Sequence, residues 1–409
     1  MADEAIDVIA MACQDSSCDF KPWNFQRRAP GPEDVLIDIK YSGVCHTDLH
    51  MAANHFSKFG VKPEYPFVPG HEMAGVCVSV GSRVTKFQAG DHVGVGCMVD
   101  SCLKCKQCVA GREHKCKKPA SLCAVQTFGD KDKHGRAAVW PKGSQTKGGY
   151  STRMVVHERF AISIPKTYPL ECAGPVFCSG ITMYEPMMEY GAKEGTRVGI
   201  IGLGGLGGIG IRIARALGCK VTAISRGQEK KSLAETLGAE SYVDSKSPEQ
   251  LAGAAQSLDL TIDTIPVHHD IHPYMQLLDT GGKHIMVGLS PTMYAALLAN
   301  PSRRVKASLI GGVARTEALL RLCDAAEPKI APEVALRPVQ ELNRIYEMLD
   351  SGNDSGVRYV LDIQGSLSEQ TFGTCTAPPP TLSKPQGLNY STVLVEAFRL
   401  MGLPCFSRI

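Results

Sequence analysis

Four cysteines with metal-binding spacing lie close together in the first third of the chain. They form the pattern C-x2-C-x2-C-x7-C, which consists of Cys102, Cys105, Cys108 and Cys116. Gaps of two residues let successive thiolates turn toward one centre, and four sulfur ligands suit tetrahedral zinc. Because protein atoms fill all four positions, the pattern predicts a structural zinc site; an iron–sulfur cluster or free thiols are the alternatives. The nearby Cys97 and Cys123 do not fit the spacing and are expected to be unliganded.

A second group of potential ligands is spread over three segments. Cys45 lies in GVCHTDLH and Cys178 lies in GPVFCSGIT. His71 and Glu72 lie in PGHE. Three protein ligands and one open position describe a catalytic zinc site, whose fourth position takes water or a substrate oxygen. This signal is weak by itself, because an isolated cysteine or histidine is more often a buried core residue.

A glycine-rich turn follows the apolar strand that begins at Arg197. The sequence GLGGLG completes G-x-G-x-x-G and leads into an amphipathic helix that ends near Leu217. Between a strand and a helix, these glycines permit a tight turn and bring a pyrophosphate close to the helix N-terminus. A turn that serves packing alone is the alternative. The predicted cofactor-binding residues of this turn are Gly202, Gly204, Gly205, Leu206 and Gly207.

The end of the next strand, residues 221–225, indicates which nicotinamide cofactor binds. An acidic residue there would bind the ribose 2′-hydroxyl and repel a 2′-phosphate. The chain has Ser225 and Arg226 instead, with Lys230 one helical turn later. A hydroxyl and two cations favour NADP(H), although a solvated basic helix start would look similar.

Strands and helices alternate after the glycine-rich turn. Strands are expected at residues 241–244, 258–265 and 284–289, with helices near 229–237, 248–256 and 272–278. This alternation predicts a parallel, doubly wound sheet in an α/β protein. Before residue 165, short β-rich runs between Gly/Pro turns, such as 35–39 and 75–80, indicate an irregular β domain or barrel.

Length and composition exclude several classes of function. A chain of 409 residues accommodates two or three domains, and its net charge of +3 predicts no general attraction to nucleic acid or anionic lipid. No apolar run is long enough to span a bilayer, and the acidic start MADEAID is unlike a signal peptide. The sixteen cysteines are therefore expected in a reducing compartment, where clusters bind metal.

In this order, the motifs resemble the zinc-containing medium-chain dehydrogenase/reductase family, and within it the NADP-dependent cinnamyl alcohol dehydrogenase-like group. The resemblance covers residues 30–363 and includes GVCHTDLH, YPFVPGHE, GDHVGVGCMVDSC, GGYS, CSGIT, GLGGLG, VTAIS and VRYVLDI. It implies a homodimer with a GroES-like catalytic domain and a Rossmann domain. The implied boundaries are 1–165 with 331–365 for the catalytic domain, 166–330 for the Rossmann domain and 366–409 for a Pro-rich tail.

The resemblance also implies roles for individual residues. Cys45, His71 and Cys178 would bind the catalytic zinc, with Glu72 close to the metal and Asp48 holding the ring of His71. The four clustered cysteines would bind the structural zinc. The resemblance further implies that Thr182 helps to place the cofactor and that Ser225, Arg226 and Lys230 hold its 2′-phosphate.

A proton relay is implied as well. Zinc would polarise the aldehyde oxygen during hydride transfer, and the proton would move from Thr47 through the cofactor ribose to His50. In the alternative interpretation, Thr47 caps a helix and His50 is an ordinary surface histidine.

The chain departs from the family pattern at three places. Gly208 follows GLGGLG where the family has histidine, and the strand after it ends in Arg226-Gly227 with fewer serines. Residues 117–147 are longer than the family segment that walls the substrate pocket, so a cinnamyl substrate does not follow. The final Ser407-Arg408-Ile409 is similar to the S-K-L peroxisomal address, with the cytoplasm as the other expected location.

The leading hypothesis is an NADP(H)-dependent zinc alcohol dehydrogenase that acts on a small molecule, mainly as an aldehyde reductase. A polyol or formaldehyde-type dehydrogenase of the same fold is one alternative. An acidic residue at the end of the second strand would support it, and the chain has none there. A catalytically silent zinc-binding relative is another, but it would lack Cys45, His71 or Cys178.

Overall fold

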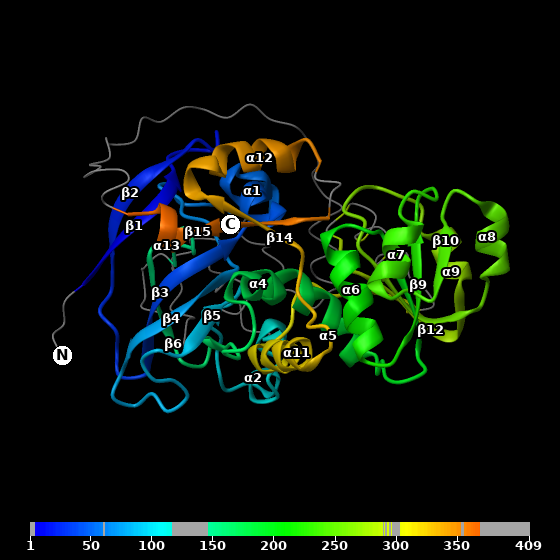
Figure 1. The fold of residues 1–409 in the computed structure, drawn as a ribbon, viewed down its shortest axis with the longest axis horizontal. Coiled ribbons are helices and arrows are strands. Elements are labelled where there is room, and N and C mark those ends of the chain that lie inside the picture. The colour runs from blue at the N-terminus through cyan, green and yellow to red at the C-terminus, as the bar shows by residue number, and fades with distance from the viewer. Residues whose placement is uncertain are drawn as a thin grey trace.

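The computed structural model describes residues 5–59, 62–116, 146–352 and 356–368, apart from 289, 291–292, 294–295 and 297–302. Two lobes lie side by side along the long axis of the molecule (Figure 1). The first lobe is rich in antiparallel strands, and the second contains a parallel sheet. Most of the segment 117–147, including Cys123, and the tail that ends in Ser407-Arg408-Ile409 lie outside the described residues.

The first lobe, called here the catalytic lobe, contains a seven-stranded sheet and a two-stranded hairpin. The order of the large sheet is β14-β15-β3-β4-β5-β7, and β6 pairs with the first half of β3. Its strands are β3 (Asp34–Gly43), β4 (Met73–Val80), β5 (His92–Val95), β6 (Arg153–His157), β7 (Ile162–Ser163), β14 (Val334–Pro338) and β15 (Arg358–Asp362). The hairpin consists of β1 (Ile6–Cys13) and β2 (Phe20–Arg27).

The second lobe, called here the coenzyme lobe, contains a parallel sheet of order β10-β9-β8-β11-β12-β13. Its strands are β8 (Arg197–Ile201), β9 (Lys220–Ser225), β10 (Ser241–Asp244), β11 (Leu258–Asp263), β12 (Leu278–Met286) and β13 (Val305–Ala307). The order reverses between β8 and β11, as in a dinucleotide-binding sheet. The predicted α/β architecture is therefore confirmed.

Helices cover both sheets and connect the lobes. The α-helices are α1 (His46–Ala52), α2 (Lys106–Val109), α4 (Leu170–Pro175), α5 (Ile181–Glu189), α6 (Gly205–Ala216), α7 (Lys231–Leu237), α8 (Pro248–Gly253), α9 (His272–Gln276), α11 (Val313–Ala325), α12 (Leu342–Asp350) and α13 (Ile363–Ser366). Short 3-10 helices are η1 (His55–Phe59), η2 (Glu113–Lys115) and η5 (Val339–Glu341). A π-helical turn, η4 (Val176–Gly180), precedes α5.

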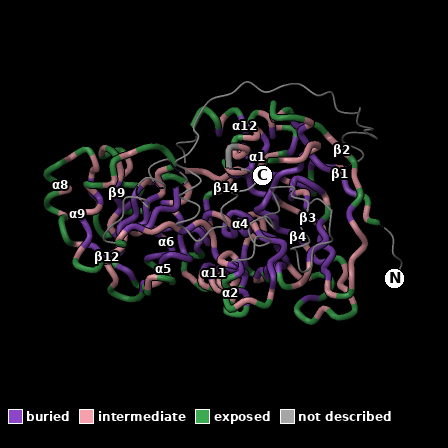
Figure 2. The backbone as a smooth tube through the Cα atoms, turned by 180° about the vertical axis from the view of Figure 1, so that it is seen from behind, coloured by how far each residue is buried: buried purple, intermediate pink, exposed green. Residues whose placement is uncertain are grey.

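One apolar core runs through both lobes. Ile37 of β3 and Ile200 of β8 belong to the same cluster of buried side chains, together with Phe177 and Ile181 where the lobes meet. Figure 2 shows these buried segments along β3, β4, α4 and α6. A continuous core fixes the lobes against each other, because separating them would expose apolar surface to water.

Most of the predicted secondary structure in the coenzyme lobe agrees with the structure. The strand expected at 241–244 and the helix expected near 229–237 are β10 and α7. The strand expected at 258–265 ends two residues earlier, and β12 begins at Leu278 rather than 284. Among the described residues, no helix combines the length and the apolar character that crossing a membrane requires.

Candidate active site

Four potential metal ligands meet between the two lobes. Cys45 is the N-cap residue of α1, His71 and Glu72 immediately precede β4, and Cys178 lies in η4. Their ligand atoms all lie within 4.8 Å of one another. The Cys45 and Cys178 sulfur atoms are 3.8 Å apart, and Nε2 of His71 is 3.3 Å from the Cys178 sulfur. Three segments distant in sequence therefore present two sulfurs and one imidazole nitrogen to a common point.

Asp48 holds this arrangement together. Its carboxylate is completely buried on α1, where Oδ1 accepts hydrogen bonds from Nδ1 of His71 at 2.9 Å and from the Gly70 amide at 3.0 Å. Oδ2 accepts from the Cys45 amide at 3.1 Å and from the Tyr150 hydroxyl at 3.3 Å. Because Nδ1 of His71 donates to a carboxylate, its Nε2 keeps a lone pair that faces the two sulfurs.

Glu72 and Arg358 form a buried ion pair beside these ligands. Oε1 of Glu72 accepts a hydrogen bond from Nη2 of Arg358 on β15, whereas Oε2 of Glu72 is buried without a partner. Burial raises the pKa of Glu72, although the Arg358 guanidinium opposes this shift. A hydrogen bond from Cys178 lowers the pKa of the Cys45 thiol well below its usual value. A divalent cation that prefers sulfur and nitrogen ligands fits this set of groups. They are the Cys45 sulfur, which readily becomes a thiolate, the oriented His71 imidazole, and the buried Glu72 oxygen that has no partner.

The four-cysteine cluster closes on itself away from this site. The Cys102–Cys116 and Cys105–Cys108 sulfur pairs are 3.4 and 3.5 Å apart, and all four sulfurs lie within 4.8 Å of one another. The backbone amide of Cys108 donates to Cys105 and lowers the pKa of Cys105 to about 6, which favours the thiolate that zinc binds. The geometry fits the predicted closed, four-sulfur site.

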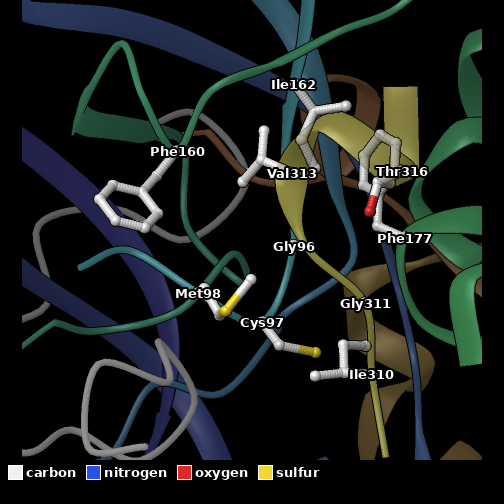
Figure 3. Close-up of a pocket in the computed structure, with 10 residues that line it drawn as sticks. All are labelled: Gly96, Cys97, Met98, Phe160, Ile162, Phe177, Ile310, Gly311, Val313 and Thr316. Carbon is white, nitrogen blue, oxygen red and sulfur yellow. The ribbon is translucent and has the colours of Figure 1, made fainter. Parts of the chain in front are cut away.

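Cys97 lies beside Cys178 and the other candidate ligands rather than beside the four-cysteine cluster. It forms a hydrogen bond with Cys178, which lowers the pKa of Cys97. Its side chain lines a small, partly open space with Phe177 and Ile310 (Figure 3). This space measures about 10 Å³, which is about the room one water molecule needs.

The residues of the implied proton relay lie along α1. Thr47 is the second residue of this helix, and because Cys45 is the N-cap, Thr47 does not cap it. His50 is partly buried, and its Nδ1 lies 3.1 Å from Nδ1 of the exposed His55. Burial and the neighbouring His55 and His46 lower the pKa of His50, so its ring is neutral at neutral pH. No sequence pattern indicated the contact between His50 and His55.

The glycine-rich turn joins β8 to α6 with the geometry of a phosphate-binding turn. Gly202 has φ +89°, and a Cβ at Gly207 would lie 1.9 Å from the Gly202 carbonyl oxygen. At Gly204, the N-cap of α6, a Cβ would meet nothing within 4 Å, so the space in front of the helix is open. Gly205 and Leu206 supply the first two residues of the twelve-residue α6. This cradle fits an anionic pyrophosphate at the helix N-terminus.

The candidate 2′-phosphate residues surround the end of β9. Ser225 is the last residue of β9, and the exposed Arg226 follows it. Nζ of Lys230 donates to the Leu203 carbonyl at 3.0 Å, which ties the start of α7 to the glycine-rich turn. Ser225, Arg226 and Lys230 thus place a hydroxyl and two cationic groups near the glycine-rich turn. Thr182, on α5, donates to the Leu309 carbonyl at 3.1 Å.

Arg358 is a second residue of the candidate site, besides His55, that the sequence analysis missed. It lies in VRYVLDI, a motif quoted only as part of the family pattern. A Cβ at Gly205 would lie 3.1 Å from Cδ of Arg358, so this residue touches both Glu72 and the start of α6. An arginine at the start of a strand with a buried apolar centre was the available signal, because burying an unpaired charge is costly.

Comparison with known proteins gives consistent matches along the chain. The model of the alcohol dehydrogenase GroES-like domain matches residues 31–166, and that of the zinc-binding dehydrogenase matches residues 205–325. A probable cinnamyl alcohol dehydrogenase from Pinus taeda is 39% identical over 364 residues, which is 88% of this chain and 96% of the relative. An 8-hydroxygeraniol dehydrogenase from Catharanthus roseus is 38% identical and covers 89% and 97% of the two chains.

Solved structures give the same result. A cinnamyl alcohol dehydrogenase from Sorghum bicolor superimposes with a TM-score of 0.76 at 35% identity, covering 88% of this chain and 99% of that one. An enzyme described as CAD from Helicobacter pylori, complexed with NADP(H), has a TM-score of 0.75 at 35% identity and covers 89% and 100%.

Proposed function

The chain belongs to the zinc-dependent medium-chain alcohol dehydrogenase family, and on this premise we propose that it acts mainly as an NADPH-dependent aldehyde reductase. It is an oxidoreductase that interconverts an alcohol and an aldehyde with NADP(H) and zinc. The observation that carries the proposal is the convergence of Cys45, His71 and Cys178 within 4.8 Å, between the catalytic lobe and the dinucleotide-binding turn.

The proposed metal-site roles follow from the contacts. Cys45, His71 and Cys178 hold the catalytic zinc, and the four-cysteine cluster holds the structural zinc. When bound, zinc supplies Lewis acidity toward the substrate oxygen and NADPH supplies the hydride. Asp48 fixes the tautomer and direction of the His71 ring. Glu72 lies close to the ligands with one unpartnered oxygen, and Arg358 neutralises the buried charge of Glu72.

Reduction of an aldehyde requires one proton at the substrate oxygen, and residues of α1 and η1 provide the path. The Thr47 hydroxyl can donate a proton and accept another. His50 is neutral at neutral pH, so its ring can take up a proton and release it again. The contact from His50 to the exposed His55 extends the path to solvent.

The proposed coenzyme contacts explain the choice of NADP(H). Gly202, Gly204 and Gly207, with Gly205 and Leu206, form the pyrophosphate turn. Ser225, Arg226 and Lys230 hold the 2′-phosphate, for which the planar guanidinium of Arg226 offers paired donors. Thr182 contributes to the crevice wall next to Leu309.

The direction and the substrate class are tested together. Purified enzyme is assayed at neutral pH with aldehyde and NADPH, and with the matching alcohol and NADP, over aromatic and aliphatic pairs. We expect faster reduction than oxidation and a strong preference for NADPH over NADH. Faster oxidation at neutral pH would contradict the assigned direction, and a preference for polyols would favour the alternative dehydrogenase.

The oligomeric state, the location in the cell and the domain boundaries also belong to the proposal. We propose a homodimer that works in the cytoplasm, with domains at 1–165 plus 331–365 and at 166–330. The family membership supports the dimer, and the arrangement of thiols as metal ligands suits a reducing compartment. Light scattering of the purified protein measures the dimer. Imaging of a form with Ser407-Arg408-Ile409 exposed tests peroxisomal import as the alternative location.

A further inference from the structure

Residues 264–271 begin beside the glycine-rich turn, at the end of the sheet where the coenzyme is expected. They follow β11, which lies beside β8 in the sheet, and the strand order reverses between these two strands. In open α/β sheets, ligands bind outside the carboxyl ends of the strands at such a reversal. Oγ1 of Thr264 donates to the Ile201 carbonyl at 2.8 Å. A Cβ at Gly202 would lie 2.5 Å from Oγ1 of Thr264. The segment therefore packs directly against the glycine-rich turn.

His269 anchors this segment through both of its ring nitrogens. Nδ1 lies 2.9 Å from the carbonyl oxygen of Val267, and Nε2 lies 2.7 Å from Oδ2 of Asp263. A carbonyl oxygen and a carboxylate oxygen only accept hydrogen bonds. Both contacts are hydrogen bonds only when both ring nitrogens of His269 carry protons, so this geometry fits an imidazolium.

The carboxylate that receives this imidazolium is deeply buried. Asp263 is the last residue of β11 and has no exposed surface. Its Oδ1 accepts a hydrogen bond from the Ile265 amide at 2.9 Å, so both oxygens hold the segment that follows β11. A buried carboxylate that lost a donor would become costly, which makes this contact sensitive to the protonation of His269.

Other titratable groups surround the pair. Nε2 of the buried His284 on β12 lies 3.4 Å from Oδ2 of Asp263, and Nδ1 of His284 contacts Oγ1 of Thr261 at 2.9 Å. The Tyr274 ring of α9 lies 6.2 Å from the His269 ring, and Asp270 is adjacent in sequence. Burial lowers the pKa of His269, but its bonds to Asp263 and Val267 outweigh burial and raise the pKa above the ordinary histidine value.

We propose that His269 is a positioning residue for the coenzyme: as an imidazolium bound to Asp263 and Val267 it holds residues 264–271 in place, and NADP(H) binds tightly only in this state. The inference rests on the proposed function, because it assigns the crevice to NADP(H). When His269 loses a proton, either the Val267 carbonyl or the Asp263 carboxylate loses its donor. Thr264 keeps its contacts with the glycine-rich turn, but residues 265–271 lose one of their two anchors and no longer hold one position beside the coenzyme.

The sign of the pH dependence follows from this geometry. The binding-competent form is the protonated one, so affinity is greatest below the pKa of folded His269 and falls as pH rises through it. A window from about pH 7 to about 9.5 lies above the second ionisation of a 2′-phosphate, near pH 6. It also lies above the lowered pKa of His50, so neither group mimics the effect.

Direct coenzyme binding to the zinc-loaded protein tests the proposal. NADPH fluorescence titrations give the dissociation constant across the pH window for wild type, His269→Gln, Asp263→Asn and His272→Gln. His272 is an exposed histidine at the start of α9 and serves as the matched control. For wild type and His272→Gln, the dissociation constant is expected to rise about ten-fold per pH unit above the pKa of His269. His269→Gln is expected to bind weakly at every pH.

Asp263→Asn separates a positioning role from simple structural support. Removing the carboxylate takes away the charge that raises the pKa of His269, so the midpoint of the pH dependence is expected to move to lower pH. A defect in folding alone would lower the amount of active protein without moving a midpoint. Thermal unfolding of each variant checks the fold.

Three outcomes of the NADPH titrations would overturn the proposed role of His269. Wild-type affinity that does not change with pH overturns the proposal, even if the variants do not fold. An unchanged affinity and pH profile in His269→Gln also overturns it. If wild type binds no NADPH while both zinc ions are present, the proposed function fails first, and the inference with it.

Discussion

Asp48 makes contacts on which three parts of the catalytic site depend. It receives hydrogen bonds from the His71 ring and from the amides of Gly70 and Cys45. Partners of this kind orient a metal-ligating imidazole and increase its basicity. The position of His71 is therefore set by a residue that contacts neither substrate nor coenzyme in the proposed mechanism.

Replacing this carboxylate should weaken the metal site. Asp48→Asn keeps the size of the side chain but removes the acceptor that fixes Nδ1–H of His71. Catalytic zinc affinity or kcat/KM is expected to fall about 10- to 100-fold. Zinc content after dialysis and steady-state kinetics measure the effect. Asp38→Asn, at an exposed ion pair with Arg153, is the matched control and should change neither quantity.

The proton path has its own test at residue level. In His50→Gln the amide cannot carry a proton, so kcat for reduction is expected to fall about 10- to 100-fold. Added imidazole should restore part of the rate, because a soluble base can occupy the same space. If kcat is unchanged in His50→Gln, the proton leaves the site by another route.

The sequence predicted some residues of the site and could not predict others. Cys45, His71 and Cys178 are far apart in the chain, so only the family resemblance, and not their spacing, brought them together. Arg358 was missed because its role comes from its ion pair with Glu72, which lies nearly 300 residues earlier in the chain. His55 was missed for a similar reason, since the turn between α1 and η1 aligns its ring with His50.

At the scale of elements, the proposed 2′-phosphate site at the junction of β9 and α7 predicts the coenzyme preference. Arg226→Asp places a carboxylate beside the expected 2′-phosphate, so it should repel NADPH and improve binding of the NADH ribose. The ratio of kcat/KM values for NADPH and NADH is expected to fall at least about 100-fold. Lys231→Asp makes the same charge change at an exposed position on α7 and is the control. An equal fall in Lys231→Asp would show a general charge effect.

Substitutions at the two candidate metal sites should have different effects, one mainly on stability and the other mainly on catalysis. Cys102→Ala removes one ligand from a loop whose apolar cluster consists of the four cysteines and whose helix α2 buries only Cys108. It should lose one zinc and unfold at a clearly lower temperature. Cys45→Ala should lose the other zinc and nearly all turnover, with a smaller change in melting temperature. Elemental analysis and calorimetry measure both, and equal effects on stability would contradict the division of roles.

The sequence predicted strands correctly where the residue pattern of a strand is bounded by clear turn residues. The strand 241–244 has clear boundaries and matches β10. The strand predicted at 284–289 begins at Leu278 instead, before Thr280-Gly281-Gly282, a sequence typical of a turn. In the structure Leu278 already pairs with Leu258, and the register shifts before Leu260 pairs with Lys283. Gly281 has φ +81°, so the glycines form an irregularity inside the strand. The π-helical turn at Cys178 had no sequence signal.

At the scale of the whole molecule, Arg358 connects the two lobes. It belongs to β15 in the catalytic lobe, pairs with Glu72 and lies against Gly205 at the start of α6. Arg358→Gln leaves the Glu72 carboxylate buried without its counter-charge, which costs about 3–5 kcal/mol. Loss of contact with α6 should also weaken NADPH binding.

Chemical denaturation and NADPH titration measure these two effects of Arg358→Gln. Arg337→Gln, at an exposed pair with Glu341, is the control and should cost less than about 1 kcal/mol. Restored stability in the double variant Glu72→Gln/Arg358→Gln would show that the unpaired charge is the cause. Full stability of the single variant would contradict the role of the ion pair.

The position of β15 has a consequence for how the protein acquires its metals. β15 pairs with Tyr41–Gly43 of β3, and the Tyr359 carbonyl accepts a hydrogen bond from the Val44 amide next to Cys45. During synthesis, Tyr41 and Ser42 can pair with β4 once that strand has emerged, but their pairing with β15 waits until residue 362 has emerged. The four-cysteine loop is complete after residue 116. All the proposed ligands of the structural zinc are therefore present early in synthesis, whereas the sheet beside Cys45 is completed near its end.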